Sequence, residues 1–187
     1  MRLAPSLAAL ALLSLAACGS EPELVAVSAP EAQGQYRVSM ATLELKEPSL
    51  PAYALADEIA VETETGLVVS GSDVLWADKP DRAIALEITR HLSALTSARI
   101  APSPWPFESL PEAALDLRFE TVLARADGTF ELAGQYFLGR LDDGRERSGR
   151  FDLSEPIAQP VGPVSISAAR ARAILALSEL LAREALR

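Results

Sequence analysis

The segment from Leu115 to Leu153 limits the fold more than any other part of the chain. Apolar and polar residues alternate there in three successive runs, at residues 115–120, 130–136 and 150–153. Asp127-Gly128 separates the first run from the second, and Asp142-Asp143-Gly144 separates the second from the third. Alternation sends successive side chains to opposite faces of a strand, and Asp-Gly is typical of tight hairpin turns. The segment therefore predicts an antiparallel meander with one apolar face.

Two other segments show helical spacing. Pro80 suits the first turn of a helix, and apolar residues then recur every three or four positions until about Ser97. This apolar stripe consists of Ile84, Ile88, Leu92 and Leu95. A second helix is expected from Ser167, a good cap residue, to about Leu186.

Shorter alternating segments at residues 36–40, 59–63, 67–70 and 73–77 predict further strands, and residues 99–101 predict a short edge strand. A sheet with one apolar face needs a second layer to cover it. We therefore expect an α+β fold, in which a mixed or antiparallel sheet carries two long helices packed on one face.

The first residues have the features of an export signal. Met1-Arg2 is followed by an apolar stretch to Ala17, which is shorter than the roughly 20 residues that span a bilayer. The stretch ends in Leu15-Ala16-Ala17-Cys18, the pattern of a lipobox, and Cys18 is the only cysteine of the chain. An ordinary signal peptide with a chance cysteine is the alternative. We predict cleavage before Cys18 and attachment of lipid to its thiol, which leaves no cysteine for a disulfide.

Three parts follow from this interpretation. Residues 1–17 are the signal peptide, residues 18–35 are a lipidated flexible tether rich in Ala, Glu, Pro, Ser and Gln, and residues 36–187 form a single α+β domain. Gly19 follows Cys18 where an aspartate would signal retention in the inner membrane. We therefore expect an outer-membrane protein, held by its lipid anchor and facing the periplasm.

Charge and side-chain chemistry argue against several functions. Loss of Arg2 with the signal takes the formal net charge from −9 to −10, which is unsuited to binding nucleic acid. His91 is the only histidine, and it lies off the apolar stripe of its helix. We interpret it as a solvated surface side chain and not as a general base. The residues predict no catalytic group, no metal site and no cofactor.

Two aromatic segments are candidates for binding. Trp76 stands at the junction between a strand and the first helix, either as a lid over the core or as an anchor in an interface. Trp105 and Phe107 lie in a proline-rich loop, which either presents them to a partner at low entropic cost or plugs the core.

The order of segments resembles a known family. A lipobox precedes an opening strand at Tyr36, the segment Leu50-Pro51-Ala52-Tyr53, a strand pair, and Trp76-Ala77-Asp78 just before the first helix. A β meander and a final Ala-rich helix complete the chain. This arrangement resembles the ABC-type transport auxiliary lipoprotein family, the PqiC-like proteins, over nearly all of the mature chain.

The resemblance implies a partner and not a reaction. Such lipoproteins resemble accessory subunits of MCE-type ABC transport systems, which move phospholipid or other hydrophobic molecules between the inner and outer membranes. The implied role is to dock a periplasmic MCE-domain protein at the outer membrane, and self-association as a ring-like homo-oligomer is compatible with it. The candidate partner contacts are Tyr53, Trp76, Trp105 and Phe107.

Two other interpretations stay open. The chain is alternatively a structural accessory lipoprotein of another envelope assembly machine, which inserts outer-membrane proteins or lipopolysaccharide. A periplasmic enzyme is the third, and it would need a cleft around His91.

Overall fold

The computed structural model describes residues 21–141 and 144–187. The predicted signal peptide at residues 1–17 and the predicted lipidation site at Cys18 lie outside the described residues. None of the described helices is long and apolar enough to cross a membrane.

The predicted meander is confirmed. Strands β6 (Ala113–Ala124), β7 (Thr129–Arg140) and β8 (Glu146–Pro156) pair antiparallel along their lengths. The hairpin between β6 and β7 turns at Gly128, whose φ of 84° favours glycine. The carboxylate of Asp127 closes this turn by accepting a hydrogen bond from the Thr129 N–H at 3.0 Å.

Five further strands complete an eight-stranded mixed sheet within the described residues. They are β1 (Glu23–Val25), β2 (Thr42–Leu45), β3 (Glu58–Glu62), β4 (Val68–Trp76) and β5 (Arg99–Pro102). One side of β6 pairs with β7, and its other side pairs in parallel with β3 and β2. At the ends of the sheet, β5 pairs in parallel with β2, and β1 pairs in parallel with β4.

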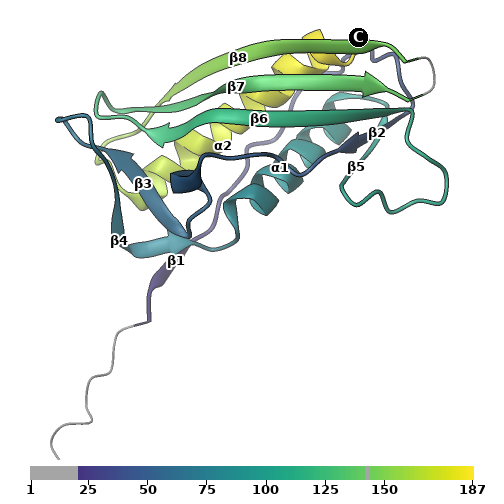
Figure 1. Cartoon of the computed structure of the whole chain (residues 1–187). Helices are drawn as coiled ribbons and strands as arrows, with labels where there is room; N and C mark the ends of the chain where they lie inside the picture. Colours follow the sequence, from purple (N-terminus) through teal and green to yellow (C-terminus); the bar gives the residue numbers. More distant parts are fainter. Residues whose placement is uncertain (1–20, 142–143) are drawn as a thin grey trace, which may run out of the picture.

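Both helices lie on the same side of the sheet, as predicted (Figure 1). Helix α1 (Pro80–Leu95) packs against β5 and against α2 (Pro163–Leu180), which crosses behind β7 and β8. Helix α2 continues into a π-helical segment, η2 (Leu181–Ala185). It begins four residues before the predicted Ser167, because Pro163 occupies its first turn and the Ser165 hydroxyl accepts a hydrogen bond from the Gly162 N–H.

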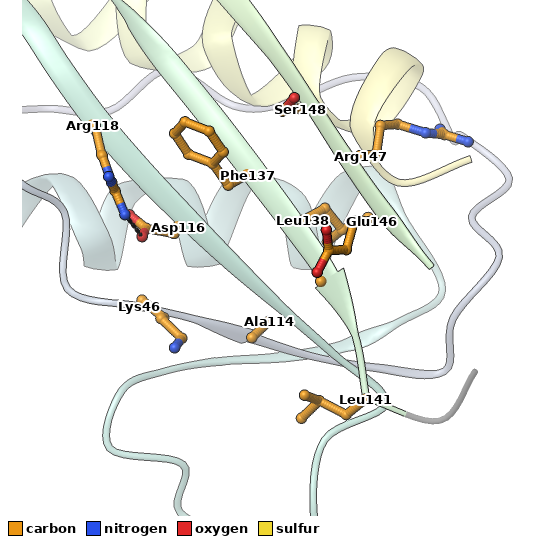
Figure 2. Close-up of a pocket in the computed structure, with 11 residues that line it drawn as sticks. Lys46, Ala114, Asp116, Arg118, Phe137, Leu138, Leu141, Glu146, Arg147 and Ser148 are labelled. Atoms are coloured by element: carbon orange, nitrogen blue, oxygen red, sulfur yellow. Dashed lines mark hydrogen bonds and ion pairs between the residues drawn. The ribbon is translucent and has the colours of Figure 1, made fainter. Parts of the chain in front are cut away.

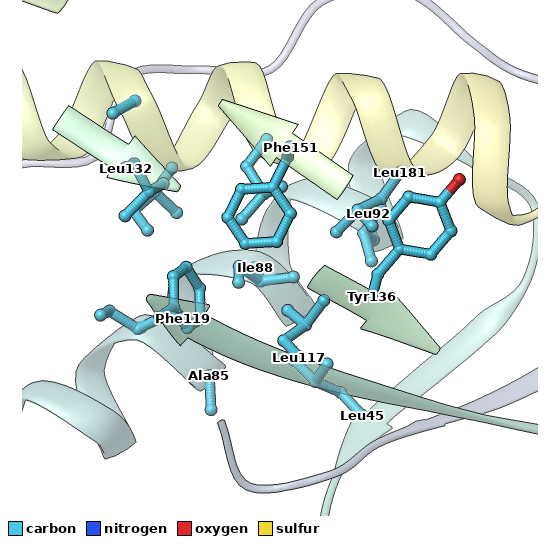
Figure 3. Close-up of a cluster of buried hydrophobic side chains, with 14 of the residues drawn as sticks. Leu45, Ala85, Ile88, Leu92, Leu117, Phe119, Leu132, Tyr136, Phe151 and Leu181 are labelled. Atoms are coloured by element: carbon cyan, nitrogen blue, oxygen red, sulfur yellow. The ribbon is translucent and has the colours of Figure 1, made fainter. Parts of the chain in front are cut away.

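The core lies between the helices and the apolar face of the meander. Figure 3 shows Leu117 and Leu132 from the strands facing Ile88 and Leu92 of α1, and all four side chains are fully buried. Burial of each such side chain contributes about 1.5–3 kcal/mol. The alternation in β6 and β7 and the apolar stripe of α1 were the sequence signals for this contact.

The prediction of a strand at residues 36–40 was wrong. The backbone N–H of Tyr36 donates to the carbonyl of Leu95 at the end of α1, and that of Ser39 donates to Leu186. These partners are the free carbonyls at helix ends, so the segment crosses the ends of both helices and the strand starts later, at Thr42.

Two further boundaries differ from prediction. Residues 67–70 and 73–77 were expected as separate segments, but they belong largely to the single strand β4, which β3 and β1 pair from either side. Helix α1 ends at Leu95 and not near Ser97. The Thr96 hydroxyl donates to the carbonyl of Leu92 at 2.8 Å and caps this end.

The flexible tether predicted for residues 18–35 needs correction at its centre. Glu23–Val25 form β1 in register with Val74–Trp76, and the side chain of Val25 is buried in the core. Residues 24–27, Leu-Val-Ala-Val, are a short apolar run between polar and proline-rich neighbours. The run does not alternate, so alternation does not predict a strand there.

Candidate partner-binding surface

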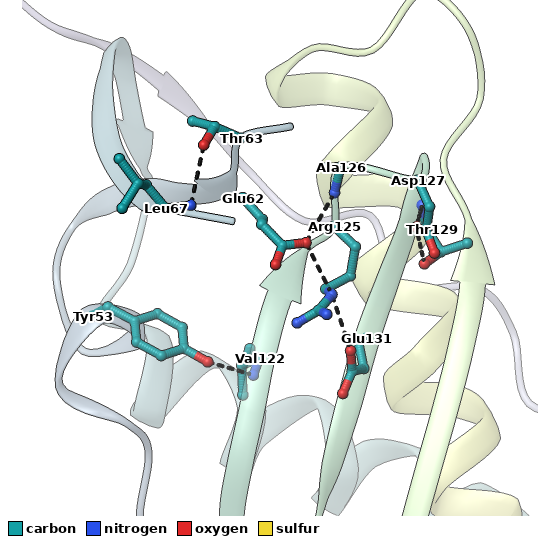
Figure 4. Close-up of polar contacts among 10 residues, drawn as sticks. All are labelled: Tyr53, Glu62, Thr63, Leu67, Val122, Arg125, Ala126, Asp127, Thr129 and Glu131. Atoms are coloured by element: carbon teal, nitrogen blue, oxygen red, sulfur yellow. Dashed lines mark hydrogen bonds and ion pairs between the residues drawn. The ribbon is translucent and has the colours of Figure 1, made fainter. Parts of the chain in front are cut away.

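Tyr53 and Trp76 lie close together. Tyr53 belongs to the short 3₁₀ helix η1 (Ala52–Ala54), and Trp76 is the last residue of β4. Both side chains are half-buried and packed against the core, and both line one small cavity of about 20 Å³. Figure 4 shows the Tyr53 hydroxyl accepting a hydrogen bond from the Val122 N–H at 3.3 Å. These contacts favour packing as the role of both aromatic side chains.

An ion pair between Glu62 and Arg125 connects β3 to the end of β6. The Arg125 Nε lies 3.2 Å from a carboxylate oxygen of Glu62 in β3 and 3.3 Å from one of Glu131 in β7 (Figure 4). Arg125 follows directly after β6, so its side chain connects three strands. This polar cluster links β3 to the meander next to the backbone bridge between Val61 and Ala124.

Beneath Trp76 lies a buried ion pair. The guanidinium carbon of Arg170 is 5.0 Å from the centroid of the Trp76 ring, within the range of a cation–π contact. Arg170 Nη2 donates to Glu87 Oε1 at 3.1 Å, and both side chains are buried. Burial raises the pKa of Glu87 more than the charges of Arg170 and Arg90 lower it. Trp76 therefore closes the outer side of a charged contact between the two helices.

The interpretation of His91 as a solvated side chain was wrong. Only 2 % of its surface is exposed, and neither ring nitrogen has a hydrogen-bond partner among the described residues. Burial lowers the pKa of His91, and the charge of Arg90 lowers it further. An imidazole shielded in this way does not meet the requirement that a general base reach its substrate.

Trp105 and Phe107 form a second aromatic pair, in the loop between β5 and β6. Their rings meet edge to face with centroids 4.9 Å apart. The Trp105 indole N–H donates to the carbonyl of Ser109 at 2.6 Å, and the guanidinium carbon of Arg99 lies 5.3 Å from the Phe107 centroid. The loop is thus held by its own contacts, and Phe107 remains 43 % exposed.

More apolar surface adjoins this loop. Leu110 is 84 % exposed and Leu141, after β7, is 61 % exposed. The backbone N–H of Leu141 donates to the carbonyl of Glu112 at 2.7 Å, which fixes the end of β7 beside the loop. We call Trp105, Phe107, Leu110 and Leu141 the loop-end surface. Exposed apolar side chains that gather on a rigid segment are typical of interaction sites.

A hollow of about 600 Å³ opens on the sheet face that the helices leave uncovered (Figure 2). The register aligns Asp116, Phe137 and Ser148 across β6, β7 and β8. The guanidinium carbon of Arg118 lies 4.9 Å from the centroid of Phe137, and Arg118 Nη2 lies 3.0 Å from Asp116 Oδ2. The hollow reaches Leu141 at its end, so it is continuous with the loop-end surface.

The four predicted contact residues thus form two groups and not one. The β5–β6 loop, which carries Trp105 and Phe107, lies at the opposite end of the view from β4 (Figure 1), the strand that ends at Trp76. Sequence reasoning missed Phe137, Arg118 and Leu141. Alternation assigns Tyr136 to the apolar face of its strand, so the next residue, Phe137, must lie on the opposite face. The sequence could therefore have predicted an outward-facing aromatic side chain at Phe137.

The arrangement that a metal site requires is absent from the described side chains. Across residues 21–141 and 144–187, no group of three or more His, Cys, Asp or Glu side chains is arranged to hold a metal ion.

Comparison with known proteins identifies a sequence match over most of the chain. A family model described as the ABC-type transport auxiliary lipoprotein component matches residues 24–183. None of the curated proteins compared matches the sequence.

Two crystal structures share the fold. An uncharacterized protein has a TM-score of 0.63 and 18 % identity, over 83 % of this chain and 99 % of its own. Protein XCC0632 from Xanthomonas campestris has a TM-score of 0.67 and 16 % identity, over 87 % of this chain and 94 % of its own. At these identities the similarity shows the fold alone.

Proposed function

Because the chain belongs to the ABC-type transport auxiliary lipoprotein family, we propose that it is the docking subunit of an MCE-type transporter. The transporter moves phospholipid or other hydrophobic molecules between the inner and outer membranes, and this subunit binds its periplasmic MCE-domain protein. The observation that carries the proposal is the match over residues 24–183, which covers nearly the whole described fold. The family is one of transport auxiliary proteins and is not a known enzyme family.

The proposal includes an anchor at the outer membrane. Lipid on Cys18 holds the chain, and only residues 19–22 separate Cys18 from the start of β1 at Glu23. Five steps along the chain reach at most about 18 Å, at about 3.3–3.6 Å per residue. The β1–β4 end of the domain therefore stays near the membrane surface.

The loop-end surface is the contact we assign to the partner. The β5–β6 loop lies across the domain from β1 (Figure 1), so it extends away from the anchor and toward the periplasm. Phe107 and Leu110 offer exposed apolar area on a loop that its own hydrogen bonds already fix. Binding to such a surface costs little conformational entropy.

The test is capture of partners from membranes. The tagged full-length lipoprotein is solubilised in mild detergent, and the proteins that remain bound are identified by mass spectrometry. We expect an MCE-domain protein in the eluate, and we expect the double variant Phe107→Ser/Leu110→Ser to lose most of it. Val164→Ser is the matched control, since Val164 is an equally apolar residue on α2 with 75 % exposure.

Two outcomes contradict the proposal. Recovery of subunits of outer-membrane protein assembly or of lipopolysaccharide export, without an MCE-domain protein, assigns the chain to another envelope machine. An MCE-domain protein retained equally by the loop-end variant and the control removes the loop-end surface from the interface.

A further inference from the structure

Strand β8 is an edge strand with a free side. Within the described residues it pairs with β7 alone. Its eleven residues, Glu146–Pro156, therefore leave one row of backbone N–H and C=O groups without a strand partner. Such a row is a template for pairing with another strand.

The hydrogen-bond pattern shows which residues point to the free side. The Arg140 N–H donates to Arg145 and the Ile157 N–H donates to Gly128, both at 2.8 Å, at the two ends of the β7–β8 ladder. Residues that bond the same partner strand alternate along an antiparallel pair. The odd-numbered residues of β8 therefore bond β7, and the even-numbered residues from Glu146 to Ser154 direct their N–H and C=O groups outward. Pro156 has no N–H, and its carbonyl accepts a hydrogen bond from Arg172 Nη2.

The side chains on this free edge carry opposite charges two residues apart. Arg150 and Asp152 are both exposed, with Ser148 and Ser154 on either side of them. Arg150 has an exposed partner within the chain, Glu120 at 2.8 Å. The Asp152 carboxylate forms no hydrogen bond or ion pair within the described residues.

We propose that β8 pairs antiparallel with β8 of a second copy, about a twofold axis at Phe151. In this register Arg150 lies directly opposite the partner subunit's Asp152, and Asp152 lies opposite the partner subunit's Arg150. Ser148 lies opposite the partner subunit's Ser154. All of these are even-numbered residues, so each facing pair exchanges its free backbone hydrogen bonds, and opposite charges that face each other across strands stabilise the pairing.

Charge selects this register over its neighbours. A shift by one residue on each strand places either Arg150 opposite the partner subunit's Arg150 or Asp152 opposite the partner subunit's Asp152. Like charges directly opposite each other destabilise a strand pair. Charged side chains also protect an edge against unrelated strands. The charges on the β8 edge therefore have two effects. They discourage pairing with an unrelated strand, and they are complementary to a second copy of β8.

Disulfide trapping tests the register in the full-length lipoprotein. Cα atoms of a directly hydrogen-bonded antiparallel pair lie about 5.5 Å apart, within the roughly 4.4–6.8 Å that a disulfide spans. The double variant Ser148→Cys/Ser154→Cys places these two cysteines opposite each other across the axis. Within one chain the two positions are about 20 Å apart along the strand, so a disulfide between them joins two subunits.

We expect the double variant to run as a dimer on a non-reducing gel after mild oxidation of isolated membranes. Each single variant is expected to stay monomeric, like the parent chain, which measures any background from Cys18. Absence of the dimer in the double variant overturns the proposal. Equal cross-linking by a single variant overturns the register.

Charge reversal provides an independent readout by sedimentation equilibrium in detergent. Asp152→Arg sets two arginines opposite each other, and we expect about a tenfold or greater rise in the dimer dissociation constant. Arg150→Asp/Asp152→Arg restores opposite charges in the same register and is expected to restore the dimer. An unchanged dissociation constant for Asp152→Arg contradicts the pairing. This inference does not depend on the transport proposal, because the dimer is measured without any partner.

Discussion

Arg170 of α2 and Glu87 of α1 form an ion pair 3.1 Å long, with side chains only 3 % and 6 % exposed. The pair crosses the contact between the two helices, and the ring of Trp76 covers Arg170 from the outside. A charge in such a place is tolerated only while its partner remains.

We predict that Glu87→Gln lowers the free energy of unfolding by about 3–5 kcal/mol, since it leaves the Arg170 charge buried without its carboxylate partner. Asp78→Asn is the matched control. It removes the carboxylate that pairs with the exposed Arg82, and it is expected to cost less than about 1 kcal/mol. Urea unfolding at neutral pH measures both, and equal losses would refute the assigned burial.

Because His91 is buried, the stability of the fold should depend on pH. The unfolded imidazole has the ordinary pKa near 6.5, whereas burial lowers the pKa of the folded one. The unfolded chain therefore binds more protons below about pH 6.5, and the free energy of unfolding decreases as the pH falls. His91→Leu removes the only histidine and is expected to remove most of this slope between pH 7 and pH 5.5. An unchanged slope would show that other groups cause it.

Gly134 in β7 predicts a steric effect. A Cβ at this position would lie 2.9 Å from the Phe119 Cα and clash with the backbone carbonyl of Arg118. Gly134→Ala is expected to destabilise the fold by about 1–3 kcal/mol. Gly139→Ala on the same strand has no atom within 4 Å of the added Cβ, so it is expected to be neutral or slightly stabilising. Thermal unfolding of the two variants makes the comparison.

The two aromatic groups should differ in their effect on stability. Trp76→Ala removes a ring packed on the core and on Arg170, and we expect a loss of about 2–3 kcal/mol. Phe107→Ala changes an exposed ring and is expected to cost less than about 1 kcal/mol. Denaturant titration measures both values. A larger loss for Phe107 would make its loop part of the core.

The sequence predicted part of the candidate surface. The prolines around Trp105 predict a stiff loop. The structure adds a hydrogen bond from the Trp105 indole to the Ser109 carbonyl, which no sequence pattern contains. Leu110 and Leu141 join that surface only because β7 ends beside the loop. His91 was misread because its helix is covered on more than one side, by α2 and by the sheet, and a single stripe of apolar residues does not reveal a second covered face.

The sequence by itself determined the meander, the first helix and the α+β class. Those features depend on alternation, helical spacing and turn residues, which act between near neighbours in the chain. Only the tertiary structure decided that β1, β2 and β5 pair in parallel, that Glu87 meets Arg170, and that β8 is left with a free edge. These contacts join residues far apart in sequence, and their stability comes from burial and backbone pairing in the assembled sheet, which no local pattern encodes.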